Sequence, residues 1–437
     1  MVEERDLKAY MRRLEDFSTL RWTGRVTKAV GHLVESDGPL CSVGEGCAIL
    51  TEDGKSFSGE IVGFRGRTVL SMPLERPSGI RFGDRIVTRG TNPSLRVGPE
   101  LLGRVIDGSG KPLDKMSNYR AREYWPLQGH PPLPLDRQPI REPLGCGIRA
   151  IDGMLTCGRG QRVGIFGGSG VGKSTLIGMM TRGTNADMTV LALVGERGRE
   201  VREFLEDAIG IVGLKRSVVV VSTSDQSPLM RIRAALAATT VAEYFSAQGK
   251  NVLLVVDSLT RFAMAQREIG LAAGEPPTAK GYTPSVFTLL ARLIERAGNF
   301  GKGSITAFYT VLMEGDDQQD PLVDAVRALL DGHVMLDRKL NSRGHYPPIS
   351  ILDSLSRLMT SVCTKEHLEK ARGLRELLAA YAASEDLVRI GAYQKGLDAT
   401  LDRALGALPA ITAYLQQKKI ENAQFPEAVK ALLALPG

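Results

Sequence analysis

Hydrophobic positions recur with different periods along this chain, and the changes of period divide it into regions. Within residues 1–20, an apolar stripe recurs at helical spacing and charged residues lie largely on the other side, which predicts a short amphipathic helix. The stripe consists of Leu7, Tyr10, Met11, Leu14 and Phe17. Because this helix precedes the first domain, the stripe serves either a partner or packing on the chain itself.

Short runs rich in Val and Ile follow, separated by Gly, Pro and Asp. They occupy residues 24–26, 47–50, 59–62, 68–72 and 85–88. Regularly spaced short strands with turn residues between them indicate a small closed β-barrel, which we place at residues 21–98. A Pro-rich stretch at residues 126–143 then indicates a stiff connector, which we place within residues 99–150.

Strand-like apolar runs alternate with helical patterns between residues 151 and 357. The expected strands are residues 162–167, 188–194, 217–222, 252–257, 304–312 and 332–336. Apolar runs separated by helices indicate a mainly parallel sheet in a doubly wound α/β domain, which with the connector spans residues 99–358. Residues 359–437 show only helical patterns, clearest at 366–381 and 399–415, and predict a C-terminal helical domain. The chain is therefore expected to be multidomain.

Composition narrows the class of protein. The 437 residues are 43% hydrophobic and 24% charged, as in an ordinary soluble protein, and no apolar run approaches the roughly 18 residues of a membrane span. We therefore expect a cytoplasmic protein. The net charge of +7 is spread along the chain, which favours a solvated mixed surface over a specific nucleic-acid site. The cysteines match no zinc or disulfide spacing and are expected to be reduced: Cys41, Cys47, Cys146, Cys157 and Cys363.

One segment carries the strongest chemical signal, because it fits the pattern G-x-x-x-x-G-K-[ST] at every fixed position. It consists of Gly167, Gly168, Ser169, Gly170, Val171, Gly172, Lys173, Ser174 and Thr175. A predicted strand precedes it and a helical pattern follows, so the N-terminus of a helix is expected on the phosphates. Lys173 reaches the β- and γ-phosphates of such a nucleotide, and the Ser174 hydroxyl can hold Mg²⁺. The segment predicts a nucleoside triphosphate with Mg²⁺ as ligands.

Hydrolysis also needs a metal holder, a group that orients the attacking water, and positive charge on the transferred phosphoryl group. Asp257 ends an apolar strand, where its carboxylate is expected beside Ser174 in the Mg²⁺ shell; a helix cap is the alternative role. Glu196 follows a glycine at another strand tip and is a candidate to polarise water. Arg197 is a candidate to secure that carboxylate or the phosphates, although surface Glu-Arg pairs are common.

The segment 344–357 closes the α/β region and offers two further candidates. Tyr346 is a candidate to stack on an adenine ring, and Arg357 is a candidate to supply charge to a neighbouring site. An arginine that completes a site from another subunit contributes about 10³- to 10⁵-fold in rate. Spacing alone leaves both roles open.

With these residues assembled, the chain resembles the rotary-type hexameric ATPases, and most closely the ATPases of bacterial flagellar protein export. The resemblance extends from about Gly24 almost to the end of the chain. Its most specific stretches are residues 103–114, 156–162, 195–204 and 266–277. Residues 223–228 and 306–317 favour the flagellar branch over the related ATPases of virulence injectisomes.

The resemblance implies a role for each candidate. Glu196 matches the catalytic carboxylate that acts on the attacking water, and Arg197 matches the neighbouring arginine of the same motif. Asp257 matches the carboxylate of the Mg²⁺ site, Tyr346 an aromatic side chain against the adenine of ATP, and Arg357 an arginine lent across a subunit interface.

The resemblance also implies partners. These are a homohexamer with sites between subunits, a regulatory stator-like export protein at residues 1–20, and export cargo and chaperones at the C-terminal domain. It implies peripheral association with a membrane export gate, so the expected location is cytoplasmic, at the base of the flagellar export apparatus.

Three other functions remain open on the sequence. A hexameric RNA translocase shares a small barrel and a phosphate loop, but the only aromatic residues between residues 24 and 98 are Phe57, Phe64 and Phe82, few for stacking bases. A subunit of a proton-driven ATP synthase needs a second partner chain. A non-catalytic scaffold does not explain the presence of Lys173, Glu196 and Asp257 together.

Overall fold

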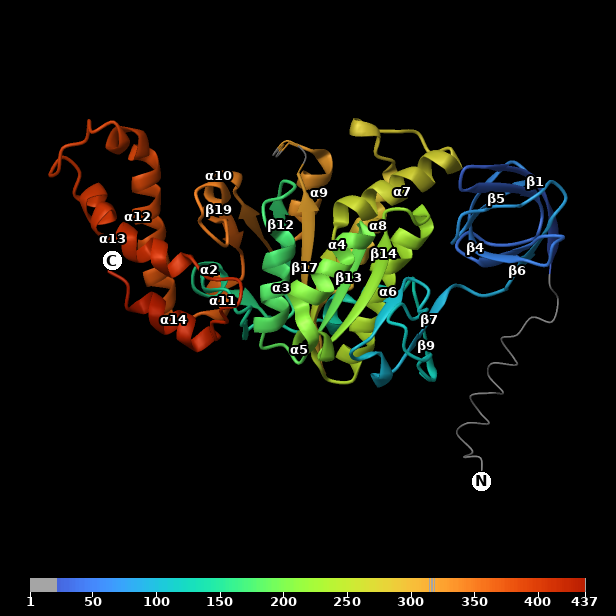
Figure 1. Ribbon diagram of the computed structural model, residues 1–437, viewed down its shortest axis with the longest axis horizontal. Coiled ribbons are helices and arrows are strands. Elements are labelled where there is room, and N and C mark those ends of the chain that lie inside the picture. The colour runs from blue at the N-terminus through green and yellow to red at the C-terminus, as the bar shows by residue number, and fades with distance from the viewer. Residues whose placement is uncertain (1–21, 314, 316, 318, 437) are drawn as a thin grey trace, which may run out of the picture.

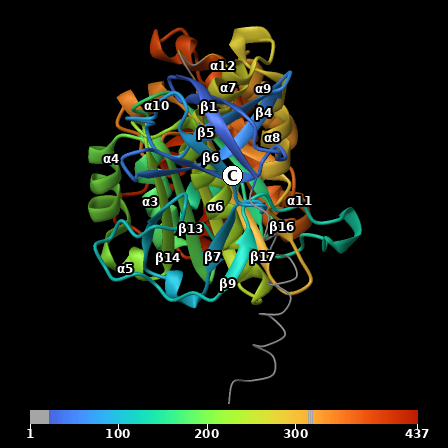
Figure 2. The ribbon, with the colours of Figure 1, turned by 90° about the vertical axis from the view of Figure 1, so that its right-hand side faces the viewer.

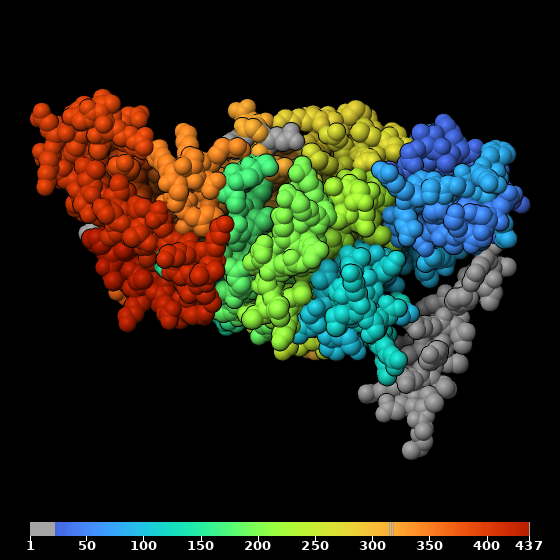
Figure 3. All heavy atoms as spheres, viewed as in Figure 1, coloured from blue at the N-terminus to red at the C-terminus, as the bar shows by residue number. Residues whose placement is uncertain are grey.

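Three structural parts lie in a row in the computed structural model (Figure 1). The structure describes residues 22–313, 315, 317 and 319–436. A β-barrel lies at one end, an α/β domain in the middle and a group of helices at the other end, and Figure 3 shows these parts packed without a break. This arrangement confirms the expected multidomain class. The helix predicted for residues 1–20 lies outside the described residues.

The N-terminal part is a closed barrel with strand order β1-β2-β5-β4-β3-β6. Its strands are β1 (Thr23–Val30), β2 (Leu33–Asp37), β3 (Gly46–Leu50), β4 (Ser56–Arg65), β5 (Thr68–Pro73) and β6 (Arg85–Thr88). The sequence did not predict β2, whose run of five residues holds only two apolar side chains. Phe57 is buried in the barrel core, so it offers no surface on which a base could stack.

The connecting region contributes short elements and one strand of the large sheet. The elements are β7 (Ser94–Val97), η1 (Pro99–Leu101), β8 (Val105–Asp107), β9 (Glu123–Pro126), η2 (Pro134–Asp136), β10 (Pro143–Leu144), α2 (Arg149–Met154) and β11 (Cys157–Gly158). The buried strand β8 pairs in parallel with the central domain and was not predicted. Residues 126–143 carry little regular structure, as expected of a Pro-rich connector.

A mainly parallel sheet forms the middle of the molecule, in the order β19-β18-β12-β17-β15-β13-β14-β8. Its strands besides β8 are β12 (Arg162–Gly167), β13 (Met188–Glu196), β14 (Ser217–Thr223), β15 (Asn251–Asp257), β17 (Ser304–Leu312), β18 (Gly332–Leu336) and β19 (Ile349–Ser356); β16 (Gly298–Asn299) pairs with β17 outside this order. All six predicted strands are present. The edge strand β19 was not predicted, and it runs antiparallel to β18.

Helices cover both faces of this sheet, and Figure 2 shows α3 and α4 on one side with α8 and α9 on the other. They are α3 (Lys173–Gly183), α4 (Gly198–Glu203), η3 (Phe204–Ile209), α5 (Gly210–Lys215), α6 (Pro228–Ala247), α7 (Leu259–Ala273), η4 (Ala279–Gly281), α8 (Pro284–Ile294), α9 (Pro321–Leu329) and α10 (Arg338–Ser342). Helix α6 is apolar nearly all round because almost all of it is buried. Its N-terminus is capped by the Ser227 hydroxyl, which accepts from the N–H of Met230.

The C-terminal part is helical, as predicted. It consists of α11 (Met359–Val362), α12 (Lys365–Arg389), α13 (Ala399–Leu415) and α14 (Phe425–Leu433). Buried residues such as Leu374 and Ile411 continue one core with Ile165 of β12, so these helices are joined to the α/β domain. Within the described residues, no helix combines the length and apolar character that crossing a bilayer requires. All five cysteines are free thiols.

Candidate active site

The phosphate-loop segment joins the end of β12 to the start of α3. Gly170 and Gly172 have φ angles of 75° and 99°, a backbone conformation that side chains with a Cβ rarely adopt. A Cβ on Gly172 would also lie 3.1 Å from the ring of Tyr346. Because α3 begins at Lys173, the unpaired N–H groups and positive dipole of its first turn lie at this loop. The local structure is that of an anion site.

Lys173 lies largely buried at the mouth of this loop. Its Nζ donates a hydrogen bond to the carbonyl oxygen of Gly167 at 2.8 Å. Burial lowers the pKa of Lys173 to about 8, although the carboxylates of Asp257 and Glu196 oppose that shift. A polyphosphate in the cavity would supply the negative charge that keeps this ammonium group protonated.

Asp257 ends β15 at the same edge of the sheet. Leu193 of β13 is its register partner, so the ends of the two strands lie side by side. Asp257 is only 6% exposed, and its Oδ1 accepts a hydrogen bond of 2.6 Å from the hydroxyl of Thr310. Burial raises the pKa of this carboxyl, whereas Thr310 and Lys173 oppose the shift. The carboxylate is therefore held in place but short of compensating charge.

Glu196 ends β13 after an irregularity in the pairing with β14 between Val194 and Glu196. Gly195, at this irregularity, has a φ of 70°, which favours glycine. Burial, with a further contribution from Asp257, raises the pKa of Glu196 to about 7. Such a carboxyl has the proton affinity of a group that can exchange a proton near neutral pH.

Arg261, in the first turn of α7, is the basic partner of Glu196. Its Nε lies 3.3 Å from Oε1 of Glu196, and its Nη1 donates to the carbonyl oxygen of Gly195 at 2.6 Å. The sequence analysis did not identify Arg261. A usable signal was present, because a charged residue in the first helical turn after a strand-end Asp lies near the same sheet edge.

Arg197 does not secure Glu196, which corrects one of the two roles suggested for it. Its side chain is 74% exposed, and Nη1 lies 3.4 Å from Oε1 of Glu200, three residues along the chain. The reason is local: α4 begins at Gly198, so Arg197 occupies the N-cap position, without a capping bond from its side chain, and Glu200 lies in the adjacent first turn. Arg197 still lines the cavity, so contact with a phosphate remains a prediction.

Tyr346 and Arg357 lie at opposite ends of β19. The Tyr346 ring lies against Gly172 of the phosphate loop, and burial raises the pKa of its hydroxyl to about 12. Arg357 follows the last residue of β19, and its N–H donates to the carbonyl oxygen of Asp331 at 3.0 Å. Asp331 in turn bonds to Arg162, the first residue of β12. The backbone of Arg357 therefore lies at the edge of the sheet where β12 starts, away from its own phosphate loop.

A cavity of about 400 Å³ brings most of the predicted residues together. Its lining is Ser169, Gly170, Gly172, Lys173, Ser174, Thr175, Glu196, Arg197, Glu200, Asp257, Ser258, Arg261 and Leu312. Tyr346 borders the loop, and Arg357 lies elsewhere. A phosphate loop, a buried lysine and two strand-end carboxylates in a parallel sheet define the class of P-loop nucleotide hydrolases.

Comparison with known proteins identifies the family within that class. Residues 147–356 match the model described as ATP synthase alpha/beta family, nucleotide-binding domain, and residues 26–90 match the beta-barrel domain of the same family. Residues 363–434 match the T3SS EscN ATPase C-terminal domain. The chain belongs to the ATP synthase alpha/beta family, and it is an ATP-hydrolysing enzyme.

Individual relatives cover almost the whole chain. The flagellum-specific ATP synthase of Bacillus subtilis (strain 168) is 50% identical over 416 residues, which is 95% of each chain. That of Salmonella typhimurium is 49% identical over 94% of this chain and 93% of the relative.

Solved structures of the assembled ATPase EscN, from the type III secretion system of enteropathogenic E. coli, are similar in fold. One has a TM-score of 0.90 at 44% identity, covering 95% of this chain and all of that chain. Another contains EscN with its central stalk EscO and has a TM-score of 0.87 at 43% identity, with the same coverage of both chains.

Proposed function

We propose that this chain is the Mg²⁺-ATP-hydrolysing subunit of a homohexameric motor that energises protein export through the flagellar type III secretion apparatus. The relatives named flagellum-specific ATP synthase support the flagellar assignment. The likeness of the C-terminal helices to those of EscN leaves the injectisome ATPases as the second candidate. The observation that carries the proposal is the separation of Arg357 from the cavity that holds Lys173, Glu196 and Asp257.

The residues of the cavity fit Mg²⁺-ATP. Mg²⁺ prefers oxygen ligands, keeps several waters and is held by one or two protein groups together with phosphates. Ser174 and Asp257 provide such a hydroxyl and carboxylate, and no larger cluster of metal-binding side chains occurs among residues 22–436 as far as they are described. When bound, Mg²⁺ would neutralise charge on the phosphates.

The protein's own groups have separate roles in this proposal. Lys173 and the N–H groups of the loop hold the phosphates, and Glu196 orients the attacking water and accepts its proton. Arg261 keeps the carboxylate of Glu196 directed into the cavity, where burial has already raised its pKa. Tyr346, against Gly172, lies where a base attached to loop-bound phosphates could stack.

Arg357 completes the site of the neighbouring subunit. Strand β12 has six residues, so its two ends lie about 16 Å apart. The backbone of Arg357 is anchored at the start of β12, and the phosphate loop follows its other end. The side chain of Arg357 is exposed and makes no hydrogen bond or ion pair with any other described residue. An exposed cation without a partner is available to a second copy of the chain, and a head-to-tail contact repeated around a closed ring produces such an arrangement.

The same reading assigns partners to the remaining parts. In the EscN complex a central stalk accompanies the assembled ATPase, which supports a homohexamer with a regulatory partner here. Residues 1–20 would bind a regulatory stator-like export protein, and the C-terminal helices would face cargo and chaperones. The assembly would lie in the cytoplasm, peripheral to the membrane export gate.

The proposal is tested by the concentration dependence of ATP hydrolysis and by Arg357→Ala. A shared site predicts specific activity that rises as hexamers form. Arg357→Ala should bind ATP with nearly unchanged affinity while turnover falls about 10³- to 10⁵-fold. Arg372→Ala, which removes an exposed arginine of α12, is the matched control and should hydrolyse normally. Turnover within a few-fold of wild type in assembled Arg357→Ala would sink the assignment.

A cellular assay separates the two branches of the family. A strain that lacks its own flagellar export ATPase should regain swimming when it expresses this chain. Restoration of injectisome secretion without restoration of swimming would favour the second candidate.

A further inference from the structure

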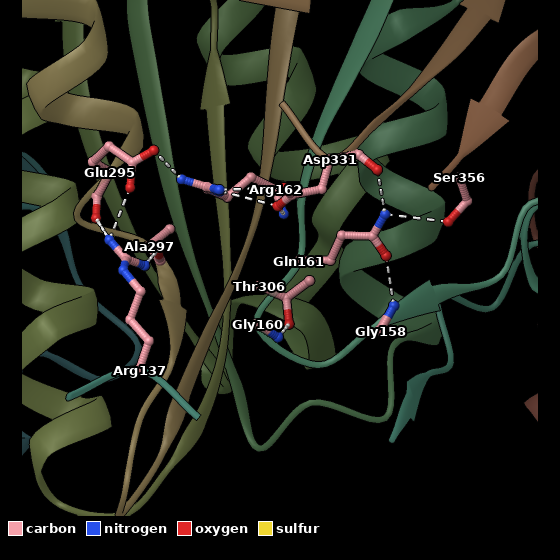
Figure 4. A network of polar contacts seen from close by, with 10 residues as sticks. All are labelled: Arg137, Gly158, Gly160, Gln161, Arg162, Glu295, Ala297, Thr306, Asp331 and Ser356. Atoms are coloured by element: carbon pink, nitrogen blue, oxygen red, sulfur yellow. Dashed lines mark hydrogen bonds and ion pairs between the residues drawn. The ribbon is translucent and has the colours of Figure 1, made fainter. Parts of the chain in front are cut away.

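A connected set of buried and partly buried polar groups lies at the edge of the sheet where β12 starts, opposite the phosphate loop (Figure 4). Arg162 pairs with the carboxylates of both Asp331 and Glu295, and Arg137 bonds to Glu295 from the other side. Gln161 lies next to Arg162 in the sequence and is completely buried. The ATP-hydrolysis site does not use any of these side chains.

The side-chain amide of Gln161 is fully engaged. Its oxygen accepts from the N–H of Gly158 at 2.8 Å. Its nitrogen donates to the carbonyl oxygen of Asp331 at 3.0 Å and to the hydroxyl of Ser356 at 3.2 Å. Figure 4 shows the amide between Gly158 on one side and Asp331 and Ser356 on the other. One amide thus joins the segment before β12 to the start of β18 and the end of β19.

Both acceptors of Gln161 lead directly to Arg357. The Asp331 carbonyl oxygen that receives the Gln161 amide also receives the backbone N–H of Arg357, at 3.0 Å. Ser356, the residue before Arg357, donates its hydroxyl hydrogen to the carbonyl oxygen of Thr156 at 2.8 Å. Packing leaves little freedom here, because a Cβ on Gly332 would lie 2.6 Å from the carbonyl oxygen of Leu355 and 3.2 Å from Nε2 of Gln161.

We propose that Gln161 is a positioning residue for Arg357, so that loss of its amide lowers hydrolysis in the site that Arg357 completes. This inference rests on the proposed role of Arg357 at the neighbouring subunit's site. The Arg357 side chain makes no hydrogen bond or ion pair within the described chain, so the backbone alone fixes the point from which it projects. Gln161 supports that backbone indirectly, through the Ser356 hydroxyl and through the Asp331 carbonyl oxygen that also accepts from the N–H of Arg357.

The choice of an amide follows from its chemistry. A glutamine side chain offers two N–H donors and one oxygen acceptor, and this site supplies two acceptors and one donor. A glutamate at this position would keep the bond from Gly158 but would lose both donors. Misplacement of a catalytic group by about 1 Å can reduce a rate about 100-fold. Loss of the amide is therefore expected to lower the rate of ATP turnover.

The test is a double-mutant cycle on ATP hydrolysis by the assembled full chain. Gln161→Met should lower kcat about 10- to 100-fold and leave the KM for ATP within about twofold. Gln161→Met in an Arg357→Ala background should lower kcat no further, because the two changes remove one function. Ser356→Ala removes the bond from Gln161 to Ser356 and the bond from Ser356 to Thr156 but keeps the bond from Gln161 to Asp331, and it should give a smaller loss of kcat.

A matched control separates positioning from general loss of structure. Arg137→Met removes a large side chain from the same set of contacts, but on the side of Glu295 and Ala297, away from Arg357. It should lower thermal stability while kcat stays near that of wild type. Binding of a fluorescent ATP analogue by Gln161→Met should match wild type, because its own phosphate loop is intact.

The possible failures are distinguishable. Normal turnover in Arg357→Ala would refute the proposed function on which this inference rests. A large loss in Arg357→Ala with normal turnover in Gln161→Met or Ser356→Ala would refute the role of Gln161 alone. A further drop of kcat in the double variant, equal to that in the single variant, would show that Gln161 acts by another route and would overturn the inference.

Discussion

The large sheet has one edge where its parallel strands end, beside the phosphate loop, and an opposite edge where those strands start. These two edges hold charged side chains under opposite conditions. At the edge with the phosphate loop, burial raises the pKa of Glu196 and Asp257 and lowers that of Lys173, so the charge of each group is disfavoured. At the opposite edge, burial also disfavours the charge of Arg162, but its bonds to Asp331 and Glu295 outweigh it and raise the pKa.

The difference separates a site from a structural support. Ionisable groups whose charge is only partly compensated by opposite charges nearby can bind an ion or exchange a proton. Groups that are fully paired with opposite charges instead hold the backbone in place. Variants of the ionised groups should therefore fail in different measurements: turnover for Glu196 at the first edge and the free energy of unfolding for Arg162 at the second. Gln161 is the expected exception at the second edge, because it positions Arg357.

Replacing the carboxylate at the phosphate-loop edge should have the largest effect. Glu196→Gln should bind ATP but lower kcat about 10²- to 10⁴-fold, because the amide cannot accept the proton of the attacking water. The free energy of unfolding should not fall, since a poorly compensated carboxylate has been removed. Glu206→Gln, on the exposed side of η3, is the control. Normal hydrolysis by Glu196→Gln would move the catalytic role to another residue.

Breaking the pairs at the opposite edge should act on stability. Arg162→Met should reduce the free energy of unfolding by about 2 kcal/mol, less than for a fully buried pair because Glu295 is partly exposed. Urea unfolding of wild type and variant measures this loss. An unchanged unfolding midpoint together with lost ATP binding would contradict the separation of the two edges.

The pH dependence of stability should report on Glu196 without Mg²⁺ or nucleotide. The pKa of this carboxyl is about 7 in the folded chain and near 4.5 when unfolded, so the folded chain binds more protons between those values. Stability should therefore decrease as pH rises through this window, by about 1–2 kcal/mol after allowance for solvent screening. Glu196→Gln should remove this contribution and keep that of Asp257, whose pKa is also raised, so urea unfolding at pH 5 and 8 should show a smaller decrease in the variant. A parallel decrease in both proteins would argue against the raised pKa.

The smallest effect is expected at Arg197. Because the exposed Arg197 side chain lies on Glu200 and not on Glu196, and such a surface pair is weak, Arg197→Ala should change kcat by less than about threefold. Arg261→Ala, which frees the Glu196 carboxylate, should cost clearly more in the same ATPase assay. The reverse order would show that Arg197 turns toward the bound nucleotide.

The sequence predicted the parts of the site that follow from strand direction. Carboxyl ends of parallel strands meet at one edge, so Glu196 and Asp257 could be expected beside the phosphate loop from the sequence alone. The position of Arg261 near this edge could have been inferred from the strand-end Asp257 before it, but its pairing with Glu196 depends on how the helix after β15 is oriented, which local pattern does not specify. For the same reason the sequence did not show that Arg197 lies on Glu200.

Fold prediction failed mainly at short or edge strands. The five residues of β2 and the three of β8 are too few for a period to appear, and pairing with distant strands decides their structure. The missed strand β19 matters most, because its antiparallel direction places Tyr346 and Arg357 at opposite edges of the sheet. From the sequence, Tyr346 was assigned to an adenine and Arg357 to a neighbouring site, but spacing alone gave no reason for their separation.

The course of β19 gives a direction to communication in the proposed ring. The strand starts just after Tyr346, which lies on the phosphate loop of its own subunit. It ends just before Arg357, which is offered to the next subunit. A displacement of Tyr346 on nucleotide binding would thus be carried along a single extended segment to the neighbour's catalytic charge. Because every subunit of the proposed ring would repeat this polarity, each nucleotide site would be linked to its neighbour in the same sense around the ring.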